Sequence, residues 1–297
     1  MRRLIVAGLM AALALGALPL SAQAKASGHP AIPAAVFTDP PVDAAHPPRM
    51  EVLHIPTDGG LEINGVAYLA AGAGPHPTVV LLHGLPGNEK NLDLAQAIRR
   101  AGWNCVTFNY RGSWGSPGTY SFRGNLADTK AVLAYVRDPA NAAKFGIDTK
   151  KLVLAGHSMG GGITAVTAGG DANLAGAVMI SSADLGVLAR APLASRLQTA
   201  RENMETLAGV TPESLAQEMS TLTDASFANA APGLAKMPLL VLTSDDGLAG
   251  MSDALAANLR KRGDTQLTTA HEATDHGWSG KRIALEARVI SWLQDLK

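Results

Sequence analysis

Ser158 has the sequence surroundings of a nucleophile. It is the centre of the run GHSMG at 156–160, which follows an apolar stretch, Lys151–Ala155, and precedes a helical pattern. A strained turn between a strand and a helix, with a glycine two residues away on either side, exposes the serine hydroxyl. A hydroxyl is a weak nucleophile at neutral pH, so it needs a base, and the base needs a carboxylate to orient it. His157 adjoins Ser158 on this turn, and we expect its side chain to point away from Ser158 Oγ.

Two carboxylates are candidates for orienting the base. Asp245 and Asp246 directly follow the predicted strand Pro238–Thr243. We favour Asp246, because it precedes Gly247 at the point where the chain must turn from the strand end toward the next helix. Neighbours along an extended segment point in opposite directions, so only one of the two can face the base. Asp245 stays open as the alternative.

The candidate base lies close to the C-terminus. His276 belongs to the run DHGW at 275–278, just beyond the predicted strand Gln266–His271. The order Ser, Asp, His along the chain is that of one particular hydrolase fold. His271 is the alternative base, although it lies inside a strand pattern, where a packed histidine is commoner. No H-E-x-x-H run is present, so the sequence gives little support to a metal-dependent hydrolase.

A glycine-rich run, HGLPGN at 83–88, follows the predicted strand Thr78–Leu82. Attack on a carbonyl carbon produces a negative oxygen that needs two N–H donors, and losing one donor costs roughly 100-fold or more in rate. We expect the backbone N–H of Met159 to be one donor. The N–H of Leu85 is our choice for the other, because such a loop exposes unpaired amides and Pro86 has no N–H.

Apolar runs alternate with helical patterns along the rest of the chain. This alternation predicts βαβ units and a mostly parallel sheet flanked by helices. The predicted strands are Met50–Ile55, Leu61–Ala70, Thr78–Leu82, Asn104–Tyr110, Lys151–Ala155, Ala175–Ile180, Pro238–Thr243 and Gln266–His271. The predicted helices are Asn91–Ala101, Arg123–Arg137, Ser158–Ala168, Leu248–Arg262 and Lys281–Leu296.

One segment, residues 186–237, has helical patterns but no strand, and it predicts a helical cap over the sheet edge; ordinary connecting helices are the alternative. Its apolar side chains would line a cleft that favours acyl or aromatic groups, although most of them are expected to pack the cap onto the sheet. These are Leu188, Leu193, Leu197, Met204, Leu207, Leu215, Met219 and Phe227. Outside the cap, Trp114 is either a pocket wall or a core aromatic.

The composition narrows the class of protein. The chain has 297 residues, with 25 Lys and Arg against 25 Asp and Glu, so no basic excess favours a nucleic-acid partner. A hydrophobic fraction of 47% is enough for a large core and excludes a disordered chain. The single cysteine excludes an intramolecular disulfide and a cysteine-based zinc site.

The N-terminus predicts export. A basic head, an apolar run at 4–18 and the sequence AQA at 22–24 together are typical of a signal peptide over residues 1–24. The run is shorter than the roughly 20 residues that a membrane span needs. Residues 25–48 are rich in Pro and Ala and predict an extended lead-in, so the folded domain is expected at 49–297. The mature protein would be periplasmic or secreted, without a membrane anchor.

Four runs together resemble the α/β-hydrolase family: HGLPGN at 83–88, NYRGSWGSPG at 109–118, GHSMGG at 156–161 and DHGW at 275–278. Within the family, the chain from about Val52 onward resembles secreted bacterial members of the prolyl-oligopeptidase and serine-aminopeptidase branches. The resemblance implies the α/β-hydrolase fold, with Ser158 as nucleophile, His276 as base and an aspartate after the strand at 238–243 as acid. The common G-x-x-D pattern at the acid is TSDD here, at 243–246, which leaves Asp245 open.

These residues predict a serine hydrolase that works through an acyl-enzyme, without a cofactor or a metal ion. Its substrate would be a small ester or a short peptide, and a carboxylic ester is the leading prediction. An aminopeptidase or dipeptidyl-peptidase-like enzyme is the alternative, and it would need a carboxylate to hold the substrate ammonium. The cap carboxylates, at helical spacing, indicate a solvated face instead; they are Glu202, Glu205, Glu213 and Glu218. An alternative of another class is a catalytically silent binding protein with the same fold.

Overall fold

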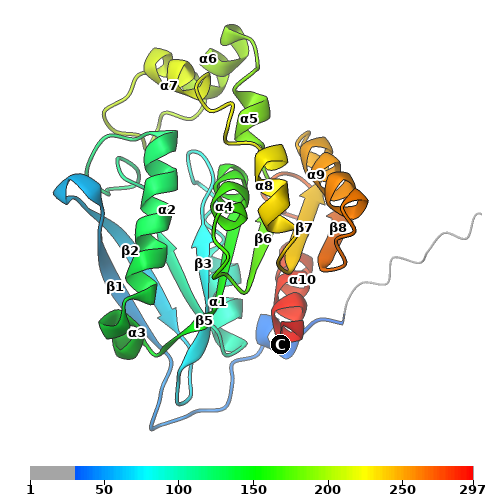
Figure 1. Ribbon diagram of the computed structural model, residues 1–297. Coiled ribbons are helices and arrows are strands. Elements are labelled where there is room, and N and C mark those ends of the chain that lie inside the picture. The colour runs from blue at the N-terminus through cyan, green and yellow to red at the C-terminus, as the bar shows by residue number, and fades with distance from the viewer. Residues whose placement is uncertain (1–30, 297) are drawn as a thin grey trace, which may run out of the picture.

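The computed structural model describes residues 31–296, so the predicted signal peptide at 1–24 lies outside the described residues. The chain is built around one eight-stranded sheet (Figure 1). Its strands are β1 Arg49–Pro56, β2 Glu62–Leu69, β3 His76–Leu82, β4 Asn104–Phe108, β5 Ile147–His157, β6 Gly176–Ile180, β7 Leu239–Ser244 and β8 Leu267–Glu272. Each strand predicted from the sequence is present, with bounds that differ by a few residues.

The strand order across the sheet is β1-β2-β4-β3-β5-β6-β7-β8. β1 pairs with β2 and β2 with β4 in antiparallel fashion, and the remaining neighbours are parallel. The prediction of a mostly parallel sheet is therefore confirmed. Because the parallel strands run the same way, the loops that follow β3, β5, β7 and β8 meet at one edge, where a site is expected in such sheets.

Helices cover both faces of the sheet. They are α1 Leu92–Arg100, α2 Phe122–Arg137, α3 Pro139–Phe145, α4 Met159–Gly169, α5 Leu185–Leu188, α6 Leu193–Arg201, α7 Pro212–Met219, α8 Phe227–Leu234, α9 Ala249–Lys261 and α10 Arg282–Asp295, with short 3-10 turns at Ala34–Val36 and Asp58–Gly60. The sequence did not predict α3. Among residues 31–296, no helix combines the length and apolar character needed to cross a membrane.

Two separate cores follow from the alternation of side chains along buried strands. In β7, Leu239 and Val241 pack into the core shared with α2, α4 and α8, whereas Leu240 and Leu242 pack into the core shared with α1 and α10. Successive residues of a strand point to opposite faces, so a strand that is apolar throughout must be covered on both sides.

The strandless segment at 186–237 divides into two parts. Helices α5, α6 and α7 lie at the top of Figure 1, beyond the carboxyl ends of the parallel strands, whereas α8 lies alongside α4. The two helices α4 and α8 pack so closely that position 233 requires glycine, since a Cβ there would lie 1.8 Å from the carbonyl oxygen of Gly169. The connection from α6 to α7 is tied to the loop after β4, where Ala208 N donates to Gly112 O at 2.8 Å.

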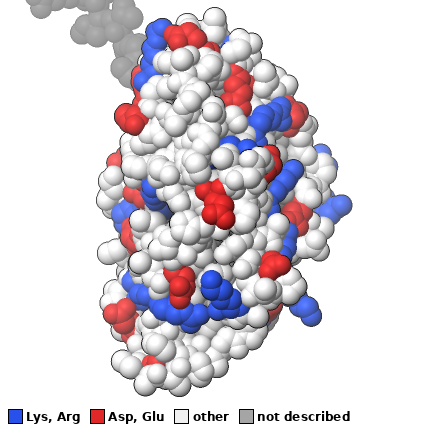
Figure 2. All heavy atoms as spheres, turned by 90° about the vertical axis from the view of Figure 1, so that its left-hand side faces the viewer, with Lys and Arg blue, Asp and Glu red and all other residues white. Residues whose placement is uncertain are grey.

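The predicted lead-in is anchored where it is described. Val36 is buried, and Arg100 of α1 donates to the carbonyl oxygens of Ala35 and Val36 at 2.6 and 2.9 Å. Elsewhere, acidic and basic side chains are interspersed over the face that Figure 2 shows, as expected for a chain with equal numbers of each.

Candidate active site

Ser158 occupies the turn between β5 and α4. Its φ of 59° and ψ of −122° lie outside the regions that ordinary residues favour, and such strain is typical of a functional turn. The close passage of strand and helix needs glycine at 156, since a Cβ there would lie 2.1 Å from the carbonyl oxygen of Gly160. The Ser158 N–H donates to Ile180 O of the neighbouring strand at 2.9 Å, which fixes the turn to the sheet.

His276 and Asp246 form what we call the inner pair. The two side chains meet with Nδ1 of His276 2.7 Å from Oδ2 of Asp246. Because a carboxylate only accepts, Nδ1 carries the proton and Nε2 is left to accept one. The Leu248 N–H donates to the other oxygen of Asp246, Oδ1, at 2.9 Å. Burial works to raise the pKa of Asp246, but the hydrogen bonds from His276 and Leu248 outweigh burial and hold this pKa below its usual value.

Asp245 and His271, the two alternatives left open by the sequence, contact each other instead and form the outer pair. His271 Nε2 lies 3.1 Å from Oδ1 of Asp245, and His271 Nδ1 lies 3.0 Å from the hydroxyl of Thr243. Both side chains are at least half exposed, whereas the side chain of Asp246 is only 1% exposed. The structure thus brings Asp246, and not Asp245, to His276.

Ser158 and His276 line one cavity of about 320 Å³. Apart from these two residues, Thr199 and Asn203, its lining side chains are apolar: Leu85, Phe122, Met159, Ala183, Leu185, Leu188, Ala189, Met219, Leu222 and Leu248. The lining residues include no aspartate or glutamate. No hydrogen bond joins Ser158 Oγ to His276 among the described residues, and in ligand-free enzymes such bonds often form only with substrate.

Leu85 and Met159, whose amides are the predicted oxyanion donors, both line this cavity. Within residues 31–296, neither backbone N–H has a hydrogen-bond partner. The loop that carries Leu85 is held from outside, since Pro86 O accepts from the indole N–H of Trp114 at 2.6 Å and from the Thr206 hydroxyl at 3.3 Å. The two residues that carry these unpaired amides thus line the cavity that contains Ser158, and an oxyanion site requires two such donors.

The structure shows which of the expected cap and loop residues line the cavity. Of the eight apolar cap residues named from the sequence, Leu188 and Met219 line this cavity, and Leu193 is exposed. Trp114 is not among the lining residues; its ring lies against Lys90, with the ammonium 4.1 Å from the ring centre. Most of the other cap residues belong to the core shared with the sheet or pack against it, as expected for a cap that packs onto the sheet.

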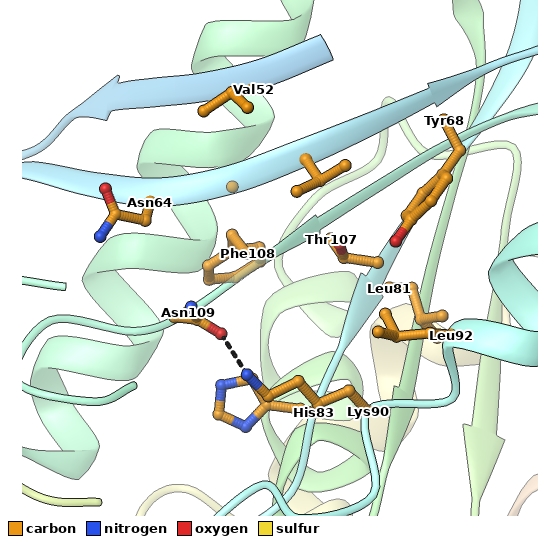
Figure 3. Close-up of a pocket in the computed structure, with 12 residues that line it drawn as sticks. Val52, Asn64, Tyr68, Leu81, His83, Lys90, Leu92, Thr107, Phe108 and Asn109 are labelled. Atoms are coloured by element: carbon orange, nitrogen blue, oxygen red, sulfur yellow. Dashed lines mark hydrogen bonds between the residues drawn. The ribbon is translucent and has the colours of Figure 1, made fainter. Parts of the chain in front are cut away.

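A second hollow of about 260 Å³ lies beside β2 and β4 (Figure 3). Its walls include Val52, Leu92 and Phe108, and at one end Lys90 donates to Asn109 Oδ1 at 2.9 Å. Neither Ser158 nor His276 lines it. Among the described residues, no group of three or more His, Cys, Asp or Glu side chains is arranged to hold a metal ion.

A model of one known protein family matches the chain. The family model of the alpha/beta hydrolase fold matches residues 77–259, which is more than half of the chain. The chain belongs to the alpha/beta hydrolase fold family. The matched residues of this alpha/beta hydrolase include Ser158 and Asp246, and His276 follows them.

Curated relatives of this alpha/beta hydrolase match over about a third of the chain. The uncharacterized protein YfhR of Salmonella typhi is 36% identical over 108 residues, which are 36% of this chain and 32% of YfhR. The quorum-quenching protein AidA of Acinetobacter baumannii is 33% identical over 108 residues, 34% of each chain. The lysophosphatidylserine lipase ABHD12 of Danio rerio is 31% identical over 91 residues, 30% of this chain and 22% of the lipase. The match thus spans about a third or less of these relatives.

Solved structures resemble this alpha/beta hydrolase over most of its length. An esterase of Pyrobaculum calidifontis has 22% identity and a TM-score of 0.59, covering 84% of this chain and 87% of the esterase. Est1E of Butyrivibrio proteoclasticus, solved with ferulic acid, has 15% identity and a TM-score of 0.63, covering 82% and 98%. An acylaminoacyl peptidase of Pyrococcus horikoshii has 15% identity and a TM-score of 0.61, covering 83% and 41%. These likenesses confirm the α/β-hydrolase fold.

Proposed function

We propose that this chain is a serine hydrolase that cleaves small carboxylic esters with apolar acyl groups. The observation that carries the proposal is that Ser158 and His276 line one mostly apolar cavity, with the imidazole of His276 held by Asp246. His276 would take the proton of Ser158 as the hydroxyl attacks the ester carbonyl, and Asp246 would stabilise the resulting imidazolium. The amides of Leu85 and Met159 would stabilise the negative oxygen of the tetrahedral intermediate.

The reaction then proceeds through an acyl-enzyme. The imidazolium of His276 returns its proton to the departing alkoxide, and the C–O bond of the ester breaks as the acyl group stays on Ser158. Water next attacks the acyl-enzyme with His276 again as base, and the acid product leaves. Nucleophile, base and donors all come from side chains and backbone, so the mechanism requires no cofactor.

The cavity lining favours an ester over a peptide with a free amino terminus. An aminopeptidase needs an anionic group to hold the substrate ammonium, and no aspartate or glutamate lines the cavity. Three of the four cap glutamates are exposed, and the fourth, Glu218, accepts a hydrogen bond from the backbone N–H of Arg123. Apolar walls instead suit an acyl chain and exclude water.

The direct test compares two chromogenic substrates, one an ester and the other an amino-acyl anilide. We expect kcat/KM on p-nitrophenyl butyrate to exceed that on leucine p-nitroanilide by at least about 100-fold, with both lost in Ser158→Ala. Anilide turnover that equals ester turnover, and that collapses when one cap glutamate becomes glutamine, would favour an aminopeptidase. No turnover of either, with no reaction at Ser158, would favour a silent binding protein.

We also propose that the protein is exported, on the sequence pattern of residues 1–24 alone. Cleavage after Ala24 would leave a mature chain that begins at Lys25. N-terminal sequencing of protein from the periplasm or the medium tests this proposal, and a mature protein that begins at Met1 would contradict it.

A further inference from the structure

The side chain of His157 contacts the loop of the candidate base. His157 directly precedes Ser158, and its Nε2 lies 2.8 Å from the carbonyl oxygen of His276, 119 residues further along the chain. The two imidazole rings are 4.6 Å apart between centroids, and His157 is only 4% exposed. One buried residue therefore touches the base and is covalently joined to the candidate nucleophile.

The direction of this hydrogen bond follows from its acceptor. A carbonyl oxygen cannot donate, so Nε2 of His157 carries the proton and donates it to His276 O. Burial, helped by the neighbouring His276, lowers the pKa of His157 to about 4, so the ring is neutral at neutral pH. Its Nδ1 is then an acceptor, and it has no hydrogen-bond partner among the described residues.

The backbone of His276 has no other anchor of this kind. Within residues 31–296, neither its N–H nor its carbonyl makes a hydrogen bond with another main-chain group. The residues that follow are held separately, because Arg282 donates to Gly277 O at 3.1 Å and Trp278 donates from its indole to Ser181 Oγ at 2.9 Å. Asp246 holds only the imidazole ring of His276. His157 is the group that ties the main chain of the base to the turn of the nucleophile.

We propose that His157 is a positioning residue that sets the separation between His276 and Ser158 by hydrogen-bonding to the His276 carbonyl. The inference rests on the proposed serine hydrolase function and extends it to a residue outside the triad. A misplacement of about 1 Å between reacting groups can cost on the order of 100-fold in rate. Loss of this hydrogen bond should therefore lower the rate of the chemical step and leave substrate binding in the cavity largely unchanged.

The test uses two substitutions of His157 and one control. His157→Ala removes the donor, whereas His157→Gln keeps an amide N–H that can reach the same carbonyl. His271→Gln changes a histidine of the outer pair, which does not line the cavity. Each protein is titrated with a fluorophosphonate so that kcat is expressed per reactive Ser158, and the thermal midpoint is measured so that assays are run well below unfolding.

We expect His157→Ala to lower kcat on p-nitrophenyl butyrate by about 10- to 100-fold with KM within about twofold of wild type. His157→Gln should recover most of this loss, and His271→Gln should match wild type. If His157→Ala keeps the wild-type kcat, or if His157→Gln is as slow as His157→Ala, the hydrogen bond does not position the base and the inference is wrong, although the serine mechanism stands. A wild-type protein that neither reacts with the probe nor hydrolyses the ester would overturn both proposals.

Discussion

Two aspartate–histidine pairs lie side by side at the carboxyl edge of the sheet, and they differ in what surrounds them. Both aspartates follow β7, and both histidines belong to β8 or to the loop after it. In the inner pair the aspartate side chain is 1% exposed, and its Oδ2 lies 2.7 Å from Nδ1 of the histidine. In the outer pair the aspartate side chain is 64% exposed, and its Oδ1 lies 3.1 Å from Nε2 of the histidine. Of the four residues, only His276 of the inner pair lines the cavity that contains Ser158.

The difference shows why neighbouring residues of the same type are not equivalent. Asp245 and Asp246 are adjacent in the turn that follows β7, yet the side chain of Asp245 is 64% exposed and that of Asp246 is 1% exposed. Away from water a charged hydrogen bond is strong, whereas an exposed pair contributes little, typically 0–1 kcal/mol. We therefore expect the inner pair to carry the chemistry and the outer pair to be dispensable.

The largest expected effect separates the two histidines. His276→Gln removes the base and should lower kcat on an activated ester by on the order of 10⁵-fold or more, as loss of a triad histidine does elsewhere. His271→Gln should stay within about threefold of wild type, since an exposed side chain away from the cavity contributes little. Steady-state kinetics of the two variants measures this contrast. Comparable losses in both would mean that the outer pair takes part in catalysis.

The next largest effect is the difference in kcat between variants of the two aspartates. Asp246→Asn leaves the size of the side chain unchanged but favours the wrong tautomer of His276, and it should cost about 10⁴-fold in kcat. Asp245→Asn should cost less than about threefold. The same ester assay decides between them, and a larger loss in Asp245→Asn would assign the orienting carboxylate to the outer pair.

Much of this arrangement follows from the sequence. The strands, though not their exact bounds, are predicted by apolar runs punctuated by glycine and polar turns, because a sheet covered on both faces requires apolar strands. The choice of Asp246 over Asp245 follows from Gly247 just beyond it, which marks where the chain turns; the side-chain alternation of an extended segment does not apply, because both aspartates lie in the turn after β7. Both features depend on local rules, which a sequence shows directly.

Other features depend on contacts between distant segments and could not be predicted. Leu188 and Leu193 are the same residue type in the same cap, yet the first lines the cavity and the second is exposed, because the orientation of α5 and α6 decides it. His157 was expected to point away from Ser158 Oγ, and nothing in its neighbourhood indicated that it would reach His276. A partner 119 residues away is fixed only by the assembled fold.

Acid should lower the free energy of unfolding partly through His157, the residue that hydrogen-bonds to the carbonyl oxygen of His276. Its pKa is about 4 in the folded protein and about 6.5 when it is solvated, so between these values the unfolded chain binds a proton that the folded protein does not. The free energy of unfolding therefore falls as pH drops from about 6.5 to about 4, by up to about 3 kcal/mol from this group.

His157→Gln removes this contribution, so its stability should decline less over the same range. Urea unfolding at pH 7 and pH 4.5 measures how much free energy of unfolding each protein loses between the two pH values. Leu193→Gln is the control, because it changes an exposed side chain that does not titrate. Equal losses of stability in wild type and His157→Gln would show that His157 is not buried as a neutral group.

The smallest expected effect concerns the cavity that His276 of the inner pair lines together with Ser158. Leu188→Ala enlarges this cavity, and the ratio of kcat/KM for hexanoate to that for acetate esters should rise by about tenfold, since one methylene in an apolar pocket is worth about 10-fold or more. Leu193→Ala, an exposed leucine of the same cap, is the matched control and should leave this ratio unchanged. A change of equal size in both variants would show that the acyl group does not enter the cavity beside Ser158.

The central claim is that Ser158 is a nucleophile activated by the inner pair, and covalent labelling tests it most directly. The full chain is treated with a fluorophosphonate and digested, and the modified peptide is sequenced by mass spectrometry. We predict one adduct, on Ser158, which disappears in Ser158→Ala and forms far more slowly in Asp246→Asn than in Asp245→Asn. An adduct on another residue, or none on a folded protein, would contradict the account.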